Sequence, residues 1–168
     1  MPQIILIAHN VRSCHNVGSL LRTAEGLGVQ EVILSGYTPY PLQDNDTRLP
    51  HIARKLDKQI HKTALGAERT QAWRTFASFQ EVRAYLKEKQ YVLAAIEQAP
   101  SSIPLPAFKP PEKVALLVGR EVEGIEPEVL SLSDIILEIP MFGQKESFNV
   151  VQAAAMTLYH CRFTLLQA

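Results

Sequence analysis

Five short apolar runs, each of the length of a β-strand, limit the fold of this chain more than any other feature. Runs of this kind, bounded by turn residues, are typical of strands buried on both faces of a parallel sheet. Between the runs, the spacing of apolar residues changes to that of amphipathic helices. This alternation predicts an α/β fold, with a parallel sheet flanked by helices. The predicted strands are residues 4–8, 31–35, 91–96, 114–119 and 134–139.

Three helices are predicted between and after these strands. The first covers Asn16 to Leu27 and places its apolar residues on one face, and the second begins after Ser78, which suits an N-cap. The third runs from Asn149 to about Leu166 and is apolar nearly all round. A helix without a polar face lies either inside a core or against a second subunit, and in a chain this short a subunit interface is one of the two interpretations. Residues 36–50 and 97–112 are rich in proline and are predicted to be loops.

Length and composition predict one compact domain, residues 1–168, because 46% of the residues are hydrophobic. No apolar run approaches the roughly 18 residues that a membrane helix needs, and the first residues do not resemble a signal peptide. We therefore expect a cytoplasmic protein that does not enter a membrane. Cys14 and Cys161 are far apart and belong to no metal-binding spacing, so we expect reduced thiols and no metal.

Charge is segregated along the chain although the formal net charge is zero. Residues 48–74 hold seven basic and two acidic residues, whereas residues 121–138 hold six acidic residues and no Lys or Arg. A basic run of this kind is typical of a solvated helix face, and it also suits a surface that contacts RNA phosphates. Both interpretations remain open from the charges alone.

Chemistry is expected where the parallel strands end, because ligands of such sheets collect at the carboxyl edge. Three segments there combine Gly or Pro with polar side chains: residues 9–22, 119–125 and 140–149. The chain has no glycine-rich dinucleotide fingerprint and no P-loop. Ser147 and His160 do not indicate a hydrolase, because no G-x-S-x-G turn surrounds Ser147 and His160 lies among apolar residues of a helix, which favours a structural role.

Taken in order, the three segments resemble the three motifs of the SpoU (TrmH-like) branch of the SPOUT RNA methyltransferases. The first motif is matched by Asn16, Gly18 and Arg22, and the third by the run IPMFGQKESFNVV at residues 139–151. The second is matched by GREVEGI at residues 119–125, in which Gly119, Glu121 and Gly124 stand at the positions of the family motif. KTALGAE at residues 62–68 is similar to a phrase found in one subgroup. Arg120 stands where family members often carry Asn.

The resemblance implies a SPOUT-type parallel sheet whose C-terminal part forms a deep trefoil knot. It also implies a homodimer that brings residues of both subunits to one active site. The expected reaction is transfer of a methyl group from S-adenosyl-L-methionine to a ribose 2′-hydroxyl of tRNA or rRNA. The chain is similar to the minimal catalytic domain of the tRNA wobble-ribose enzymes.

The same resemblance assigns roles to particular residues. Arg22 is expected to clamp an RNA phosphate and to stabilise the developing alkoxide, because arginine stays protonated; general-base action by Arg22 is left open. Asn16, Glu121, Ser147 and Asn149 are expected to orient the ribose and Arg22, although Asn149 also suits a helix N-cap. The predicted cofactor-binding residues are Ala95, Ile96, Gly119, Ile139, Met141 and Phe148.

The predicted RNA surface combines the basic segment with one residue of the first motif, because phosphate contacts supply most sequence-independent affinity. Its residues are Arg12, Arg48, Arg54, Lys55 and Lys62. Two other functions are weighed beside ribose methylation. One is an RNA-binding family member that transfers no methyl group, which the presence of Arg22 and Glu121 disfavours. The other is methylation of a guanine base, which the third motif disfavours.

Overall fold

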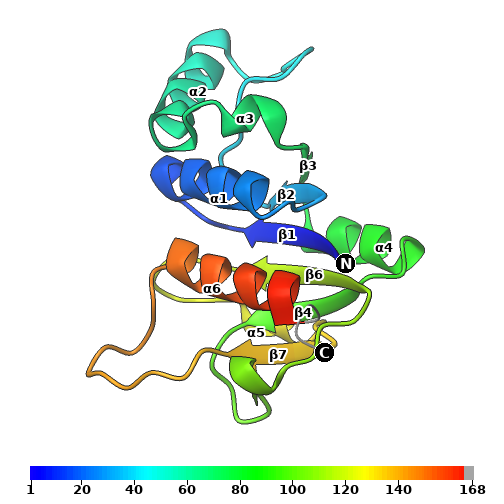
Figure 1. Ribbon diagram of the computed structural model, residues 1–168. Coiled ribbons are helices and arrows are strands. Elements are labelled where there is room, and N and C mark those ends of the chain that lie inside the picture. The colour runs from blue at the N-terminus through cyan, green and yellow to red at the C-terminus, as the bar shows by residue number, and fades with distance from the viewer. Residues whose placement is uncertain (165–168) are drawn as a thin grey trace.

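The described residues form a sheet that is parallel throughout and has seven strands in the order β3-β2-β1-β6-β4-β7-β5. All of them except β5 are labelled in Figure 1. The computed structural model describes residues 1–164. Helices cover both faces of the sheet, so the predicted α/β architecture is confirmed. The strands are β1 (Gln3–His9), β2 (Glu31–Ser35), β3 (Trp73–Phe76), β4 (Val92–Ile96), β5 (Ile103–Pro104), β6 (Lys113–Val118) and β7 (Ile135–Glu138).

The helices occupy the segments between the strands and after the last strand, and two of them lie in the basic segment, residues 48–74. Ser78 is the predicted N-cap: its hydroxyl accepts a hydrogen bond from the N–H of Glu81, whose carboxylate accepts one from the N–H of Ser78. The last helix ends at Phe163, and its predicted continuation to Leu166 lies outside the described residues. The helices are α1 (Cys14–Gly26), α2 (Pro50–Ala64), α3 (Ala67–Thr70), α4 (Phe79–Glu88), the 3-10 turn η1 (Leu105–Ala107), α5 (Pro127–Leu130) and α6 (Val150–Phe163).

Two apolar cores lie on the two faces of the sheet. Successive residues of β1 alternate between them: Leu6 packs on the side of α1 and α6, and Ile7 on the side of α4 and α5. Both side chains are fully buried. Burial of such a side chain contributes about 1.5–3 kcal/mol, and it explains why these strands are continuously apolar in sequence.

Arg162, near the end of α6, fastens that helix to two other parts of the chain. Its guanidinium donates hydrogen bonds to the backbone oxygens of Pro2 at 3.0 Å, Leu27 at 2.9 Å and Gly28 at 2.6 Å. Two residues before Arg162, His160 shares a 2.7 Å hydrogen bond with the backbone oxygen of Phe108, so the structural role predicted for this histidine is confirmed. The C-terminal helix is therefore held firmly against α1 and β1.

The strands have their carboxyl ends at one edge of the sheet, and an irregular segment at that edge precedes α6. Residues 139–149 extend beyond the sheet after β7, and the chain then returns as α6 beside α1 (Figure 1). Within residues 1–164, no helix combines the length and hydrophobicity needed to cross a membrane. In the same part of the chain, no group of three or more His, Cys, Asp or Glu residues is arranged to hold a metal ion.

Candidate active site

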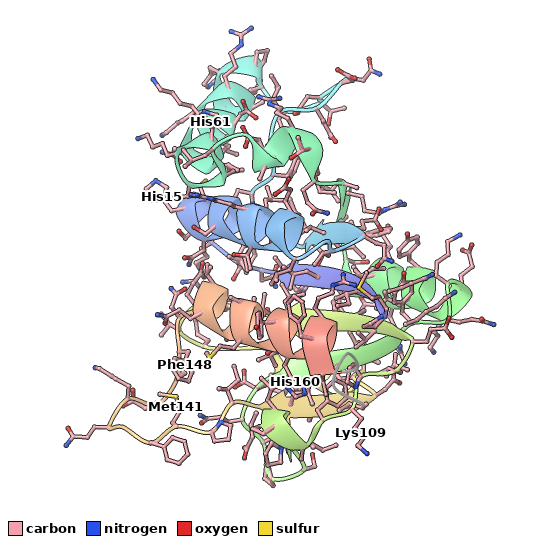
Figure 2. The ribbon with its side chains drawn as sticks, viewed as in Figure 1. His15, His61, Lys109, Met141, Phe148 and His160 are labelled. Atoms are coloured by element: carbon pink, nitrogen blue, oxygen red, sulfur yellow. The ribbon has the colours of Figure 1, made fainter. Side chains whose placement is uncertain are left out.

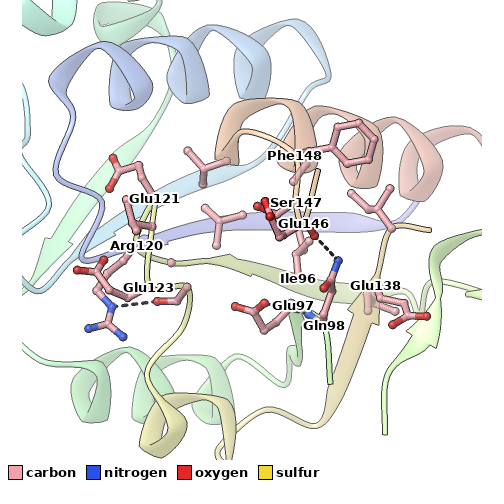
Figure 3. A pocket seen from close by; sticks show the side chains of 18 of the residues that line it. Ile96, Glu97, Gln98, Arg120, Glu121, Glu123, Glu138, Glu146, Ser147 and Phe148 are labelled. Carbon is pink, nitrogen blue, oxygen red and sulfur yellow. Dashed lines mark hydrogen bonds between the residues drawn. The ribbon is translucent and has the colours of Figure 1, made fainter. Parts of the chain in front are cut away.

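A half-open hollow of about 260 Å³ lies where β4, β6 and β7 end. Parallel strands bring their carboxyl ends together, which places three distant parts of the sequence around this hollow (Figure 3). Its walls are formed by residues 96–98, 118–124, 137–139, 141, 146–148, 150 and 153. The second and third predicted motifs therefore meet at one site.

Five of the six residues predicted to bind the cofactor line this hollow. The loop before α6 contributes Met141 and Phe148 (Figure 2), and the strand ends contribute Ile96, Gly119 and Ile139. The sixth, Ala95, does not reach it: the residue is fully buried and packs in the core on the α4 side. Strand alternation explains the difference, because successive side chains point to opposite faces.

The loop after β6 is shaped by two glycines. A Cβ at Gly119 would lie 2.7 Å from Cγ1 and 3.0 Å from Cα of Ile125, so only glycine lets the loop fold back against the strand end. Gly124 has a φ of +74°, and a Cβ there would collide with Oε2 of Glu97. The atoms that crowd Gly119 thus belong to Ile125 of the same loop. Both glycines allow this loop to adopt the conformation that forms one wall of the hollow.

Glu121 connects this loop to the start of α1. Its carboxylate accepts hydrogen bonds from the backbone N–H groups of Arg12 at 3.1 Å and Ser13 at 2.9 Å, and from the side-chain amide of Asn16 at 3.3 Å. Burial raises the pKa of Glu121, but these hydrogen bonds outweigh burial and lower the pKa below its ordinary value. The first motif is thereby held against the second.

The other predicted catalytic residues differ in their surroundings. Ser147 lines the hollow and is exposed. Asn149 caps α6, since its side-chain oxygen accepts the N–H of Val151 at 2.8 Å. Arg22 is exposed on α1 and is not among the residues that line the hollow of its own chain. Asn16, Glu121 and Ser147 therefore lie together at one edge of the sheet, whereas Arg22 lies outside the hollow.

Glu97 and Gln98 were not predicted, and both line the hollow directly after β4. Oε2 of Glu97 accepts the N–H of Ile125 at 3.1 Å, and Oε1 accepts the N–H of Gln98 at 2.9 Å. The side-chain amide of Gln98 donates to the backbone oxygen of Glu146 at 2.7 Å (Figure 3). Glu97 thus fixes the loop after β6, and Gln98 fixes the loop before α6. Their position directly after a predicted strand was the available signal.

The hollow is acidic. Among the described residues of its lining, Arg120 is the only basic one. Its Nε donates to the backbone oxygen of Gly124 at 3.0 Å and lies 3.6 Å from Oε1 of Glu126. Acidic side chains and apolar strand ends line the same hollow. The lining therefore suits a ligand that has both an apolar part and a positive charge. The carboxylates belong to Glu97, Glu121, Glu123, Glu138 and Glu146.

Two of the predicted RNA-binding residues are engaged within the protein. Arg12 forms a 2.9 Å ion pair with Glu123. Arg48 donates to the backbone oxygens of Tyr40 and Pro41 at 2.9 Å each, pairs with Asp46, and stacks 3.6 Å from the centre of the Tyr40 ring. Arg48 therefore holds its own loop together, which was not predicted.

The remaining basic residues of the segment fall into two groups. Arg69 pairs with Asp57 and Arg74 pairs with Glu31. Exposed side chains on α2 make up the second group: Arg54, Lys55, Lys58 and Lys62. The solvated helix face considered from the sequence is thus present, and it carries the predicted Arg54, Lys55 and Lys62.

A second, more open hollow of about 470 Å³ lies where β1 and β2 end. His9 and Asn10 line it, and Asn10 has a positive φ of 56° while its side chain donates to Glu126 at 2.6 Å. Burial lowers the pKa of His9, which the Glu126 carboxylate partly offsets. The predicted catalytic and cofactor-binding residues are not part of its lining.

The chain is similar to known proteins over nearly its whole length. The model of the SpoU rRNA Methylase family matches residues 3–159. A 23S rRNA (guanosine(2553)-2′-O)-methyltransferase, RlmP of Bacillus subtilis, is 28% identical over 166 residues that cover 94% of this chain and 57% of the relative. A tRNA (guanosine(18)-2′-O)-methyltransferase of Thermus thermophilus is 28% identical over 99% of this chain and 78% of its own length.

Similarity of fold extends to solved structures. The SpoU methyltransferase AviRb from Streptomyces viridochromogenes, in complex with the cofactor AdoMet, superposes with a TM-score of 0.79 at 22% identity, covering 99% of this chain and 62% of that chain. The present chain thus spans less than two thirds of the length of some of these proteins. Because the family model covers all three motifs, the chain belongs to the SpoU rRNA methylase family.

Proposed function

We propose that this protein transfers a methyl group from S-adenosyl-L-methionine to a ribose 2′-hydroxyl of tRNA or rRNA. The observation that carries the proposal is the assembly of three distant motifs at one edge: Glu121 binds Asn16, while Ser147 lies in the hollow that Glu121 also lines. Membership of the SpoU family supports it. Relatives named for 23S rRNA and for tRNA support both classes of substrate.

The residues of the hollow fit S-adenosyl-L-methionine. Ile96, Ile139, Met141 and Phe148 offer an apolar wall for the adenosine, and the carboxylates offer a counter-charge for the sulfonium and ammonium groups. When bound, this cofactor supplies an electrophilic methyl group. The task of the protein is then to hold a ribose oxygen in line with that methyl group, about 3 Å from it, and to keep competing water away.

Arg22 is assigned the role of RNA clamp. In this proposal its guanidinium binds a phosphate next to the target ribose and stabilises negative charge that develops on the attacking oxygen. Asn16 and Ser147 orient the ribose, and Asn149 orients the start of α6. Glu121 acts through Asn16 and the first residues of α1, because its hydrogen bonds go to that segment.

The active site we propose is completed by a second copy of the chain. Arg22 lies outside the hollow of its own subunit, and α6 exposes Tyr159 by 61% and Phe163 by 36% of their surface. Burying these aromatic side chains against a partner is favourable. A homodimer with α6 in its interface would bring Arg22 of one subunit toward the hollow of the other.

The path of the chain favours a trefoil knot. From β4 the chain leaves through β5, returns to β6 between β1 and β4, passes to β7 outside β4, and then returns as α6 beside α1. We propose that α6 passes through the loop formed by this detour.

We further propose that residues 1–168 form a single domain. The cytoplasm, where tRNA and rRNA are modified, is the proposed compartment.

The proposed RNA surface is the exposed face of α2 with Arg54, Lys55 and Lys62, extended by Arg12 beside the hollow. Arg48 is not included, because its donors face its own loop. Phosphate contacts of this kind add affinity without choosing a sequence.

The test is transfer of labelled methyl from S-adenosyl-L-methionine to total tRNA and total rRNA, followed by digestion to nucleosides. Wild-type protein should yield a 2′-O-methylated nucleoside from one pool, and Arg22→Ala should lose at least about 100-fold in rate. Lys89→Ala, an exposed residue beyond α4, serves as the matched loss of positive charge and should retain activity. Cofactor binding without transfer would indicate an RNA-binding protein, and a methylated base would indicate base methylation.

A further inference from the structure

Glu97 stands at the end of β4 and is held, like Glu121, by backbone N–H groups on both of its carboxylate oxygens. Both of its oxygens accept backbone N–H groups, from Ile125 at 3.1 Å and from Gln98 at 2.9 Å, so the side chain is fixed inside the wall. Among residues 1–164, none of the ion pairs includes Glu97. Within this part of the chain, its negative charge is therefore balanced only by backbone dipoles.

Each of the other carboxylates is bound by a side chain or is more exposed. Glu121 binds the start of α1, and Glu123 pairs with Arg12. Glu138 accepts a 2.6 Å hydrogen bond from the hydroxyl of Ser102, and Glu146 lies on the exposed loop before α6. Glu97, Glu121 and Glu138 are thus half-buried carboxylates of the lining that form no ion pair within the described residues. Glu121 and Glu138 also accept hydrogen bonds from side chains, whereas Glu97 accepts only backbone N–H groups.

We propose that Glu97 determines specificity for the charge of the cofactor, so that the hollow favours cationic S-adenosyl-L-methionine over the neutral S-adenosylhomocysteine that remains after transfer. This inference rests on the proposed function and names what one residue of the same site contributes. It also gives Glu97 a second role beside positioning of the loop after β6, which the carboxylate holds through Ile125.

The charges of the two ligands follow from the reaction. Transfer breaks the bond between sulfur and the methyl carbon and forms a bond between that carbon and the ribose oxygen. The bonding electron pair stays on sulfur, and the proton of the ribose hydroxyl leaves to solvent. A sulfonium, an ammonium and a carboxylate sum to a charge of +1 before transfer. A neutral thioether, an ammonium and a carboxylate sum to zero afterwards.

The hollow is small enough for this difference in ligand charge to change the electrostatic interaction with Glu97. A sphere of its volume is about 8 Å across, which is no longer than the Debye length of about 8 Å at physiological ionic strength. A positive charge anywhere inside is therefore incompletely screened from a carboxylate in the wall. An attraction between two charges at this range, partly exposed to solvent, changes an affinity by about threefold to tenfold.

Gln98 provides a matched control within the chain. Its side chain fixes the loop at Glu146 as Glu97 fixes the loop at Ile125, but it carries no charge. Loss of Gln98 should loosen the wall and weaken the binding of both ligands by a similar factor. Loss of charge at Glu97 should instead change the ratio of the two affinities.

The experiment is calorimetric titration of wild type, Glu97→Gln, Gln98→Ala and Glu123→Gln with S-adenosyl-L-methionine and with S-adenosylhomocysteine, each variant being checked for native circular dichroism. The amide introduced by Glu97→Gln keeps an oxygen that can accept the N–H of Ile125. In this variant the preference for the cationic ligand should fall by about threefold to tenfold. In Gln98→Ala the ratio should be unchanged, and in Glu123→Gln, where the carboxylate is already paired, it should change less than about twofold.

An unchanged ratio in Glu97→Gln, or an equal change in Gln98→Ala, overturns the inference and leaves the proposed function intact if wild type binds the cofactor and transfers methyl. Failure of wild type to bind either ligand overturns the inference and the proposed cofactor together. The ratio measured for wild type should also fall as salt is raised, and it should fall less in Glu97→Gln.

Discussion

Asn16 and Glu121, which are 105 residues apart in the sequence, are joined by a 3.3 Å hydrogen bond from the asparagine amide to the carboxylate. The same carboxylate accepts the N–H groups of Arg12 and Ser13. One side chain of the loop after β6 therefore orders the start of α1. Stability and activity should both depend on it.

Replacing Glu121 with Ala should lower the free energy of unfolding by about 1–2 kcal/mol, because three donors lose a charged acceptor that is partly exposed. Urea denaturation measures the change. Glu123→Ala is the control, since it removes only an exposed ion pair and should cost less than Glu121→Ala. Equal losses in the two variants would contradict the role given to Glu121.

Glu121 should also contribute to the dependence of stability on pH. Its pKa is lowered in the folded state, so its contribution is fully present above the unfolded value of 4.5 and is lost as the pH falls through the folded value. The difference in unfolding free energy between wild type and Glu121→Gln should be largest near neutral pH and should shrink below about pH 4.5. A difference that grows on acidification would contradict this sign.

Gly124 should not tolerate a side chain. Gly124→Ala places a Cβ in the left-handed region and against Glu97, which should cost about 1–2 kcal/mol for the backbone alone and weaken cofactor binding. Gly143→Ala is the matched control in the other loop, because a Cβ there would meet no atom within 4 Å. Titration of both variants with the cofactor should show weakened binding for Gly124→Ala only.

The two cysteines should differ in reactivity. Burial raises the pKa of Cys161 to about 12, so its thiol stays protonated and out of reach at pH 8. Burial also raises the pKa of Cys14, which is only half buried. A thiol reagent should therefore label Cys14 slowly in the native protein and Cys161 only after unfolding. Cys14→Ser identifies the signals, and equal native rates would contradict the prediction.

Arg162 should be among the residues most costly to replace. Arg162→Ala leaves the backbone oxygens of Pro2, Leu27 and Gly28 without this donor, and we expect a loss of about 2–4 kcal/mol in unfolding free energy. Arg162→Lys should recover only part of it, because one ammonium cannot match the planar fork of a guanidinium. Arg69→Ala, which removes an exposed partner of Asp57, should change stability by less than about 1 kcal/mol.

Much of the sheet could be predicted because buried parallel strands are continuously apolar, as the five predicted runs are. The two strands that were missed lack this pattern. β3 (Trp73–Phe76) is an edge strand with half-exposed side chains, and β5 (Ile103–Pro104) has two residues. The basic segment was interpreted either as a solvated helix face or as an RNA surface, and the bounds of α2 (Pro50–Ala64) were not predicted, because this helix buries only Ala53, Ile60 and Ala64.

Motif residues could be predicted where the sequence itself carries them, as with Gly119 and Phe148. Residues whose role depends on distant partners could not. Glu97 holds Ile125, 28 residues away, and Arg48 folds back on Tyr40 and Pro41. Nothing in local spacing distinguishes an arginine held by its own loop from one that is free for RNA.

The most direct test of the account is where on the nucleotide the methyl group is placed. RNA labelled by the wild-type protein is hydrolysed in alkali, which cleaves each phosphodiester through the neighbouring free 2′-hydroxyl. A 2′-O-methyl group blocks that cleavage, so we expect the label to be recovered in dinucleotides. Recovery of the label in mononucleotides would show that a base is methylated, and would contradict it.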